Sequence, residues 1–348
     1  MKKILSVILC CCLLLSGGAL SIHANVKQPP VSIMEEDTIE EIMEFVSLDN
    51  MTGEISYETL SYTPEARGMS NGNNDNVRPA YIPESVKPVE MEGGVTTRDV
   101  IGSDNRTKIT GTTTFPYSAV CCFDTSDGGG GTAWMIGPNI AVTAAHCIYN
   151  DESGTRDSIS SFWAGKKGPG DGWWLDNHNP FGTTSVTNIK YPAMYETFTG
   201  EDANNHERTR YDWAVLILAD ADLGYDTGWF GFGWTNSYPE DEGYTITGYP
   251  TDTENGIEKY YMYTAGGTVR GGGTPTENTL EDIILFHNVD TGKGQSGAPM
   301  YDSTYTVYGI QRKSYSYTTN IAVRITHDIF VCLDRIEEIQ TISPGVFP

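Results

Sequence analysis

Short apolar segments separated by turn residues dominate the chain after Arg98, and this pattern restricts the fold more than any other feature. The segments are rich in β-branched and aromatic residues and alternate with Gly, Asn, Asp and Pro. They span residues 117–123, 133–136, 140–144, 214–218, 244–248, 283–286 and 306–310. Many short strands with regular turn signals predict an antiparallel sandwich or barrel rather than alternating strands and helices. Residues 99–348 are enough for two small barrels with a cleft between them.

One helix is expected, at the end of the chain. Thr326 can cap it, Asp328 suits its first turn, and Ile329, Leu333 and Ile336 follow helical spacing. The sequence therefore predicts an all-β fold that ends in a helix.

The first residues have the features of a secretory signal. Lys2 and Lys3 precede an apolar run from Ile4 to Leu15, and small residues then lead to Ala24. This run is shorter than the ~18 apolar residues that are needed to cross a bilayer. We expect a signal peptide over residues 1–24 and a secreted, extracellular protein without a membrane anchor.

Residues 25–98 differ in composition from the rest of the chain. They are poor in aromatic residues and rich in acids, Pro, Ser, Asn and Gly, and residues 68–76 have a linker composition. Apolar spacing predicts one helical stretch over residues 33–46. We expect a propeptide that is removed on activation, and a permanent acidic tail is the alternative.

The formal net charge of the chain is −24. A surface of this sign repels nucleic acid and anionic membranes, so neither is expected as a partner.

Four cysteines remain after the signal peptide is removed, and they are Cys121, Cys122, Cys147 and Cys332. An oxidising compartment permits disulfides, but four cysteines in a chain of this length cannot form a disulfide scaffold. We expect one bridge.

Two motifs carry groups suited to nucleophilic catalysis. They are Thr143-Ala144-Ala145-His146-Cys147 and Gly294-Gln295-Ser296-Gly297-Ala298-Pro299. A serine hydroxyl becomes a nucleophile when a neighbouring imidazole takes its proton, and flanking glycines let backbone N–H groups approach a developing oxyanion. Between the motifs, Asp212 directly precedes the apolar run 213–218. The order His146, Asp212, Ser296 is that of the chymotrypsin-type triad, which predicts a serine protease.

Other histidines and aspartates of the chain are less suited to the same chemistry. His178, His206, His287 and His327 lack a setting comparable to that of His146, and Asp202, Asp220 and Asp222 do not directly precede a buried strand. Ala298 stands where an α/β-hydrolase nucleophile turn needs glycine. Because His-Glu-x-x-His and zinc-spaced cysteine pairs are absent from the sequence, no metal or cofactor is expected.

Taken together, these motifs resemble those of the bacterial glutamyl endopeptidases, secreted chymotrypsin-fold serine proteases of Gram-positive bacteria. The resemblance runs from about Val100 to Ile336. It rests on the segments 100–107, 134–138, 143–149, 211–212, 248–250 and 294–299. It implies two six-stranded antiparallel β-barrels followed by the C-terminal helix, with the catalytic domain over residues 99–348.

The resemblance also assigns roles near the nucleophile. The backbone N–H groups of Gly294 and Ser296 are expected to form the oxyanion hole. In the family, glutamate preference is associated with a Thr shortly before the nucleophile and a His on the following strand. Thr291 matches the first, but Gln311 stands at the second position. Arg312 and Lys313 either supply the missing positive charge to the substrate or point to solvent, and the sequence leaves both open.

Two further expectations follow from the resemblance. In related enzymes, a cysteine shortly before the conserved Trp often forms a disulfide with the cysteine that follows the catalytic histidine. Gly131 stands at the first of these positions here, so Cys121 or Cys122 is the candidate partner of Cys147. Cleavage after Arg98 or Asp99 would leave Asp99 or Val100 as the new amino terminus, which in related enzymes packs near the specificity pocket. A glutamate-specific enzyme could not cut after Arg98 itself. Either a separate activating protease with basic specificity makes this cut, or staged trimming begins at an acidic site such as Glu92, and the sequence leaves both open.

The sequence thus predicts a monomeric secreted serine endopeptidase that acts on polypeptides through an acyl-enzyme and prefers Glu, with Asp second, before the cut. One alternative is a protease of the same fold that prefers Gln or a small polar residue there. Another is a catalytically silent, toxin-like binding protein.

Overall fold

The computed structural model describes residues 41–62, 77–88, 104–169, 178–198, 206–235, 243–252, 256–269, 283–316 and 319–342. The predicted signal peptide, the linker 68–76 and the predicted cut near Arg98 lie outside these ranges. No helix within them is both long and apolar enough to cross a membrane.

The first half of the catalytic region forms an antiparallel sheet with the strand order β10-β5-β6-β7-β12-β11. A bridge between Phe162 in β10 and Thr184, just before β11, joins the two ends of this sheet. Its strands are β5 (Val120–Thr125), β6 (Gly130–Gly137), β7 (Ile140–Thr143), β10 (Ile159–Ala164), β11 (Val186–Pro192) and β12 (Ala214–Leu218). All five residues of β12 are buried, which explains why this strand is a continuous apolar run instead of an alternating one.

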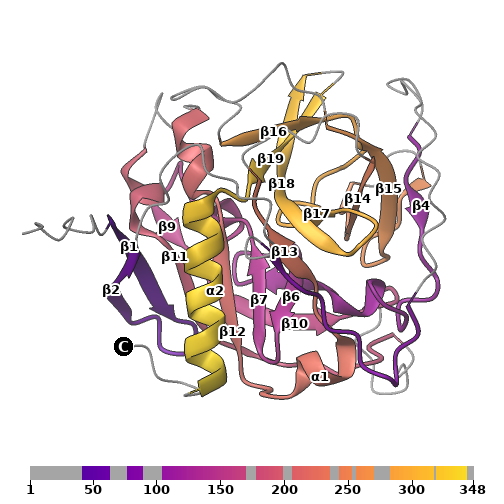
Figure 1. Ribbon diagram of the computed structural model, residues 1–348, viewed down its shortest axis with the longest axis horizontal. Coiled ribbons are helices and arrows are strands. Elements are labelled where there is room, and N and C mark those ends of the chain that lie inside the picture. Colours follow the sequence, from indigo (N-terminus) through magenta and orange to yellow (C-terminus); the bar gives the residue numbers. More distant parts are fainter. Residues whose placement is uncertain are drawn as a thin grey trace, which may run out of the picture. The chain divides into compact units, whose positions relative to one another are not determined.

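The second half forms another sheet, with the order β16-β19-β18-β17-β14-β15-β4. A bridge between Val269, just after β15, and His287 in β16 connects the two sides of this sheet. Its strands are β4 (Thr107–Lys108), β14 (Gly243–Gly248), β15 (Tyr263–Thr268), β16 (Ile284–His287), β17 (Pro299–Tyr301), β18 (Thr306–Ser316) and β19 (Thr319–Arg324), with β13 (Gly231–Gly233) and β3 (Val77–Arg78) attached through β18. Figure 1 shows the two sheets with most of their strands labelled.

Short helical segments connect the strands. They are η2 (Tyr117–Ala119), η3 (Ala145–Cys147), η4 (Ala193–Thr197), η6 (His206–Tyr211) and α1 (Leu223–Thr227), and β8 (Tyr149–Asn150) pairs with β9 (Thr155–Arg156) between β7 and β10. The predicted terminal helix is present as α2 (His327–Ile342), with Ile329, Leu333 and Ile336 buried. The Ile329 backbone N–H donates to Thr326 Oγ1 at 3.4 Å, as expected for a cap. The predicted all-β class with a C-terminal helix is confirmed.

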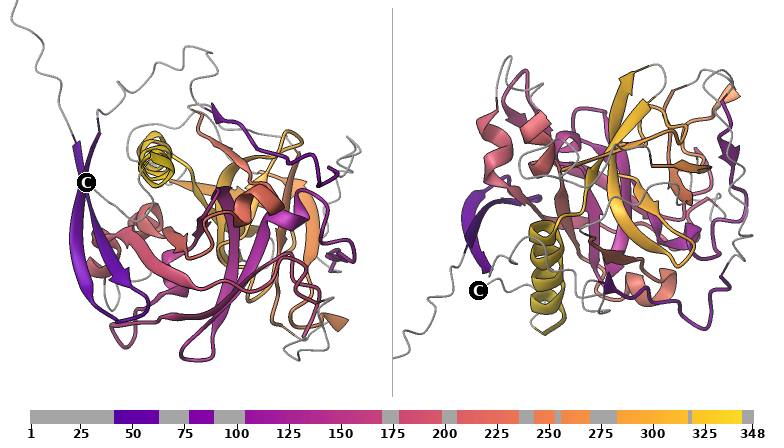
Figure 2. Two further views of the ribbon diagram at one scale, coloured as in Figure 1. Left: turned by 90° about the horizontal axis from the view of Figure 1, so that it is seen from below. Right: turned by 45° about the horizontal axis from the view of Figure 1, so that its top comes forward.

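The helix predicted over residues 33–46 is wrong where the structure describes it. Residues 41–49 form strand β1 (Glu41–Asp49), which continues through a turn into β2 (Ile55–Tyr62). β1 also pairs with β11 and so lengthens the first sheet by two strands. Figure 2 shows this hairpin along the edge of that sheet. Ile42, an apolar position of the expected helix, is 69% exposed, so its side chain does not drive the fold of this segment. Pairing with the open edge of β11 instead provides hydrogen-bond partners for the backbone N–H and C=O groups of β1.

The hairpin is tightly packed against the first sheet. The Phe45 and Trp213 rings pack edge to face with their centroids 5.6 Å apart, and Phe45 and Val46 are fully buried. The buried Asn50 side chain donates to the carbonyl groups of Ile159 and Val186, both at 2.9 Å. Each fully buried apolar side chain of this size contributes about 1.5–3 kcal/mol. Part of the segment expected to be a propeptide is therefore continuous with the core of the first sheet.

Candidate active site

His146 and Asp212 meet because their strands are neighbours. β7 pairs with β12, and Thr143 lies opposite Ala214, so the residues that follow β7 face those that precede β12. His146 Nδ1 lies 2.9 Å from Asp212 Oδ2, and the His146 backbone N–H donates to Asp212 Oδ1 at 2.9 Å. With Nδ1 protonated and facing the carboxylate, Nε2 of a neutral His146 is available as a base.

The carboxylate is buried in a strongly charged setting. Burial opposes its ionisation, but the neighbouring His146 and Arg312 hold the pKa of Asp212 well below its usual value. Burial lowers the pKa of His146, and the Asp212 carboxylate more than offsets this, so the pKa is raised. Asp212 is thus ionised and stabilises a proton on the imidazole, which is 30% exposed.

Ser296 lies in the loop between β16 and β17, beside β18. The Ser296 hydroxyl donates to the Arg312 carbonyl oxygen at 3.2 Å, and the Ser296 carbonyl accepts from Thr132 N–H at 2.9 Å. Among the described residues no hydrogen bond joins Ser296 to His146. In catalytic sites, the hydrogen bond between a nucleophile and its base is often long or poorly aligned until substrate binds.

Glycine is required at position 297, directly after Ser296. Gly297 has φ +84°, and a Cβ there would lie 2.2 Å from both the Thr132 carbonyl and Thr143 Oγ1. The loop therefore packs directly on β6 and β7 of the first sheet, next to the segment that leads from Thr143 to His146.

The loop before Ser296 has the geometry of an anion-binding turn. Thr251 N–H donates to the Lys293 carbonyl at 2.6 Å. Because the Gly294 N–H belongs to the same trans peptide unit as that carbonyl, it points in the opposite direction. Thr132 Oγ1 donates to the Gly294 carbonyl at 2.8 Å, and Gly294 has φ +88°. Neither Gly294 N–H nor Ser296 N–H donates to any acceptor in the described part of the chain. Both are therefore available to a developing oxyanion.

Arg312 occupies a position that the sequence did not indicate. Its Nε donates to Asp212 Oδ2 at 2.6 Å, and its side chain is 7% exposed. It therefore contacts the carboxylate next to His146. Lys313, the other expected source of charge, is exposed.

Thr291 and Gln311 lie together as expected, and a residue that sequence reasoning did not select joins them. Gln311 Nε2 donates to Thr291 Oγ1 at 2.9 Å, and Gln311 Oε1 lies 2.9 Å from Nε2 of the fully buried His287. Burial lowers the pKa of His287 to about 4, so its ring is neutral near pH 7 and its Nε2–H holds the amide oxygen. Nothing in the sequence linked His287 to Gln311.

The disulfide expected between Cys147 and Cys121 or Cys122 is wrong, because all four cysteines of the described residues carry free thiols. The strand register explains this: Phe123, not a cysteine, lies opposite Gly131. Cys147 faces Gly131, where a Cβ would lie 3.0 Å from its Sγ.

The expected amino termini Asp99 and Val100 lie outside the described residues, but the segment that follows them contacts the nucleophile loop. Asn105 N–H donates to Asp290 Oδ2 at 2.9 Å, and Arg106 Nη1 donates to Gln295 Oε1 at 3.4 Å. Arg106 also forms an ion pair with Asp252. Within the described ranges, no group of three or more His, Cys, Asp or Glu side chains is arranged to hold a metal ion.

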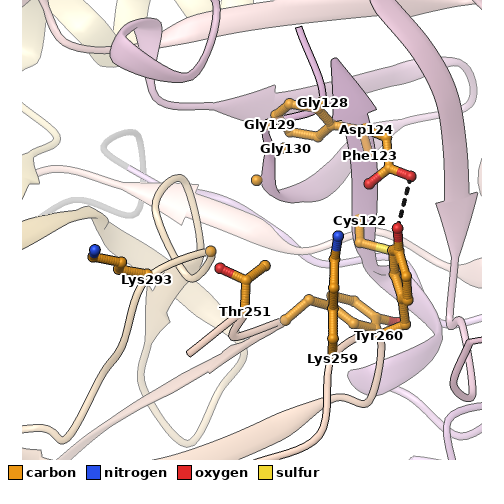
Figure 3. Close-up of a pocket in the computed structure, with 13 residues that line it drawn as sticks. Cys122, Phe123, Asp124, Gly128, Gly129, Gly130, Thr251, Lys259, Tyr260 and Lys293 are labelled. Atoms are coloured by element: carbon orange, nitrogen blue, oxygen red, sulfur yellow. Dashed lines mark hydrogen bonds between the residues drawn. The ribbon is translucent and has the colours of Figure 1, made fainter. Parts of the chain in front are cut away.

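A cavity of about 370 Å³ opens beside Gly294. Its walls include the glycine-rich turn 128–131, Thr251 and the side chains of Lys259 and Lys293, as Figure 3 shows.

Comparison with known proteins identifies the class. Residues 131–310 match the model of the trypsin-like peptidase domain. The chain is 30% identical over 226 residues to the glutamyl endopeptidase of Bacillus licheniformis, a match that covers 65% of this chain and 58% of that relative's length. It is also 30% identical over 254 residues to a Bacillus subtilis protein named extracellular metalloprotease, covering 69% of this chain and 71% of the relative.

Solved structures agree on the fold. A Glu endopeptidase in complex with MPD has a TM-score of 0.57 at 24% identity, covering 69% of this chain and 99% of the other. A mutant of human heparin binding protein has a TM-score of 0.51 at 14% identity, covering 71% of this chain and 100% of the other. The chain belongs to the trypsin-like peptidase family. Within that family, the resemblance to the glutamyl endopeptidases is confirmed.

Proposed function

We propose that the chain is a secreted serine endopeptidase in which Ser296 is the nucleophile, His146 the general base and Asp212 the residue that orients the base. The observation that carries this proposal is the pairing of His146 Nδ1 with the buried Asp212 carboxylate, next to a serine loop with two unused backbone N–H groups.

In the proposed reaction, Ser296 Oγ attacks the peptide carbonyl while His146 Nε2 takes the hydroxyl proton. The oxyanion that forms accepts hydrogen bonds from Gly294 and Ser296 N–H. His146 then gives its proton to the leaving amine, and the acyl-enzyme is hydrolysed by water through the same base.

We further propose that the residue before the cut is Glu, with Asp second. Three observations support this: Thr291 and Gln311 are hydrogen-bonded neighbours, Gln311 keeps a second amide hydrogen for a ligand, and one relative is named for glutamyl cleavage. Since Gln311 and Thr291 are neutral donors, they also suit the carboxamide of Gln, which makes a Gln-preferring protease the second candidate.

Maturation after Arg98 or Asp99 by an activating protease is supported by the contacts of Asn105 and Arg106, which follow the cut along the chain, with the loop that carries Ser296. A monomer that acts outside the cell on polypeptides is part of the same proposal.

A cleavage profile on a mixed peptide library tests the proposal, with Ser296→Ala as the control. Cuts after Glu that are absent from the variant support it. Cuts after Gln support the second candidate, and no cutting by the processed wild type supports the silent binding protein.

A further inference from the structure

The cavity beside Gly294 lies on the side of the site from which the leaving part of a substrate departs. This placement rests on the proposed function. Gly294, whose N–H faces the oxyanion, forms one wall. Gly131 forms another and lies against Cys147, which directly follows the proposed general acid His146. The leaving amine takes its proton from His146, so the chain attached to that amine starts between these two walls.

The acyl side of the substrate lies elsewhere. Thr291, Gln311 and Arg312 do not line the cavity, and Arg312 adjoins Ser296 through its carbonyl group. At about 370 Å³ the cavity falls within the range of small-ligand sites, roughly 300–1,000 Å³, so it can hold a side chain together with its backbone.

The wall made by residues 128–131 consists of backbone only. All four residues are glycines, and at Gly130 a Cβ would lie 2.3 Å from the Phe123 carbonyl. The pairing of β6 with β5 thus excludes a side chain at Gly130, so no side chain of this wall blocks the approach of a peptide.

The charged side chains of the cavity are mainly cationic. Lys259 and Lys293 project from separate loops on the two sides of Thr251 (Figure 3). Lys259 Nζ lies 4.6 Å from the centre of the Tyr260 ring, and neither lysine forms an ion pair with a carboxylate in the described residues. The one acid of the lining, Asp124, accepts a hydrogen bond from Tyr260 at 3.1 Å and offsets part of this charge. The excess of cations stands out in a chain with 22 basic and 46 acidic residues.

We propose that this cavity binds the first residues after the scissile bond and that Lys259 and Lys293 select an acidic side chain there. The net charge of −24 repels acidic peptides at long range, but at physiological salt that repulsion decays over about 8 Å. Contacts within the cavity therefore determine the preference.

Matched peptides test the proposal. The acyl side is held at the residue found in the cleavage profile, and the first and second leaving positions carry Glu, Gln or Lys in turn. We expect kcat/KM for Glu to exceed that for Gln by roughly threefold to tenfold, the contribution of one or two partly exposed ion pairs, and to decrease with added salt. Lys is expected to be slower than Gln.

The variants separate this subsite from the protease activity. Lys259→Gln/Lys293→Gln is expected to abolish the Glu-over-Gln ratio, whereas Arg335→Gln on the exposed side of α2 changes the net charge by one unit and leaves the ratio as in the wild type. Equal rates for Glu and Gln in the wild type, or an unchanged ratio in the double variant, would overturn the subsite alone. Absence of cleavage of every peptide by the wild type would overturn the proposed function itself.

Discussion

Gly131→Cys should form a disulfide with Cys147 and stabilise the first sheet. A Cβ built on Gly131 lies 3.0 Å from Cys147 Sγ. An S–S bond of about 2.04 Å places a Cβ about 3 Å from the far sulfur. Gly131 has no positive φ, so its backbone accepts a side chain without strain.

The expected change in the free energy of unfolding follows from the length of the loop that the disulfide closes and from one steric contact. The bridge closes the segment 131–147, close to the ~15-residue loop for which chain entropy gives about 3 kcal/mol. Against this, the same Cβ lies 2.9 Å from Phe123 Cζ, so the ring must move, and such overpacking costs about 1 kcal/mol at least. The net gain of about 2 kcal/mol corresponds to a rise in unfolding temperature of roughly 4–8 °C.

Thermal unfolding with and without reductant measures this gain, and mass spectrometry reports whether the bridge forms. Gly131→Ser supplies the matched side chain without a thiol, and Gly131→Cys/Cys147→Ser removes the partner. A bridged variant that unfolds at or below the wild-type temperature, or an oxidised variant in which both thiols stay free, would refute the reasoning.

Three further substitutions probe the account. Arg312→Met should shift the acidic limb of the pH profile of kcat/KM to higher pH. Without the guanidinium, the Asp212 carboxylate stabilises protonated His146 more strongly, so the neutral base forms only at higher pH. Arg312→Lys should fall between the two, and identical profiles would contradict this reasoning. In urea titrations of the unprocessed chain, Phe45→Ala should lower the free energy of unfolding by about 3–5 kcal/mol, against less than about 0.5 kcal/mol for the exposed Ile42→Ala. Gln311→His should raise the Glu-over-Gln ratio before the cut, most strongly at acidic pH, because the new imidazole titrates while an amide does not.

Local sequence patterns predicted the parts of the fold that depend on local burial. The apolar run Ala214–Leu218 coincides with β12, and helical spacing of Ile329, Leu333 and Ile336 located α2. The sequence also predicted that His146 meets Asp212, and the glycine after Ser296 marks backbone that packs closely on the first sheet.

Strand β1 could not be predicted in the same way. Its conformation depends on β11, which lies more than a hundred residues further along the chain, and on the Phe45–Trp213 contact. Without that partner, the apolar spacing of Ile42 and Met43 suits a helix equally well.

The side chains around the nucleophile depend on register and on contacts between strands. A register shift between Gln311 and Lys313 determines which way Arg312 points, and alternation alone does not reveal it. His287 reaches Gln311 only because β16, β19 and β18 are neighbours in one sheet.

The most direct test of the account is the pairing of cleavage with covalent labelling at Ser296. Processed wild type treated with a fluorophosphonate probe should be labelled on Ser296 and should cut library peptides after Glu, while His146→Ala and Ser296→Ala should do neither. Cleavage that persists in Ser296→Ala, or a wild type that neither binds the probe nor cuts any peptide, would contradict the proposal that this site is a serine endopeptidase.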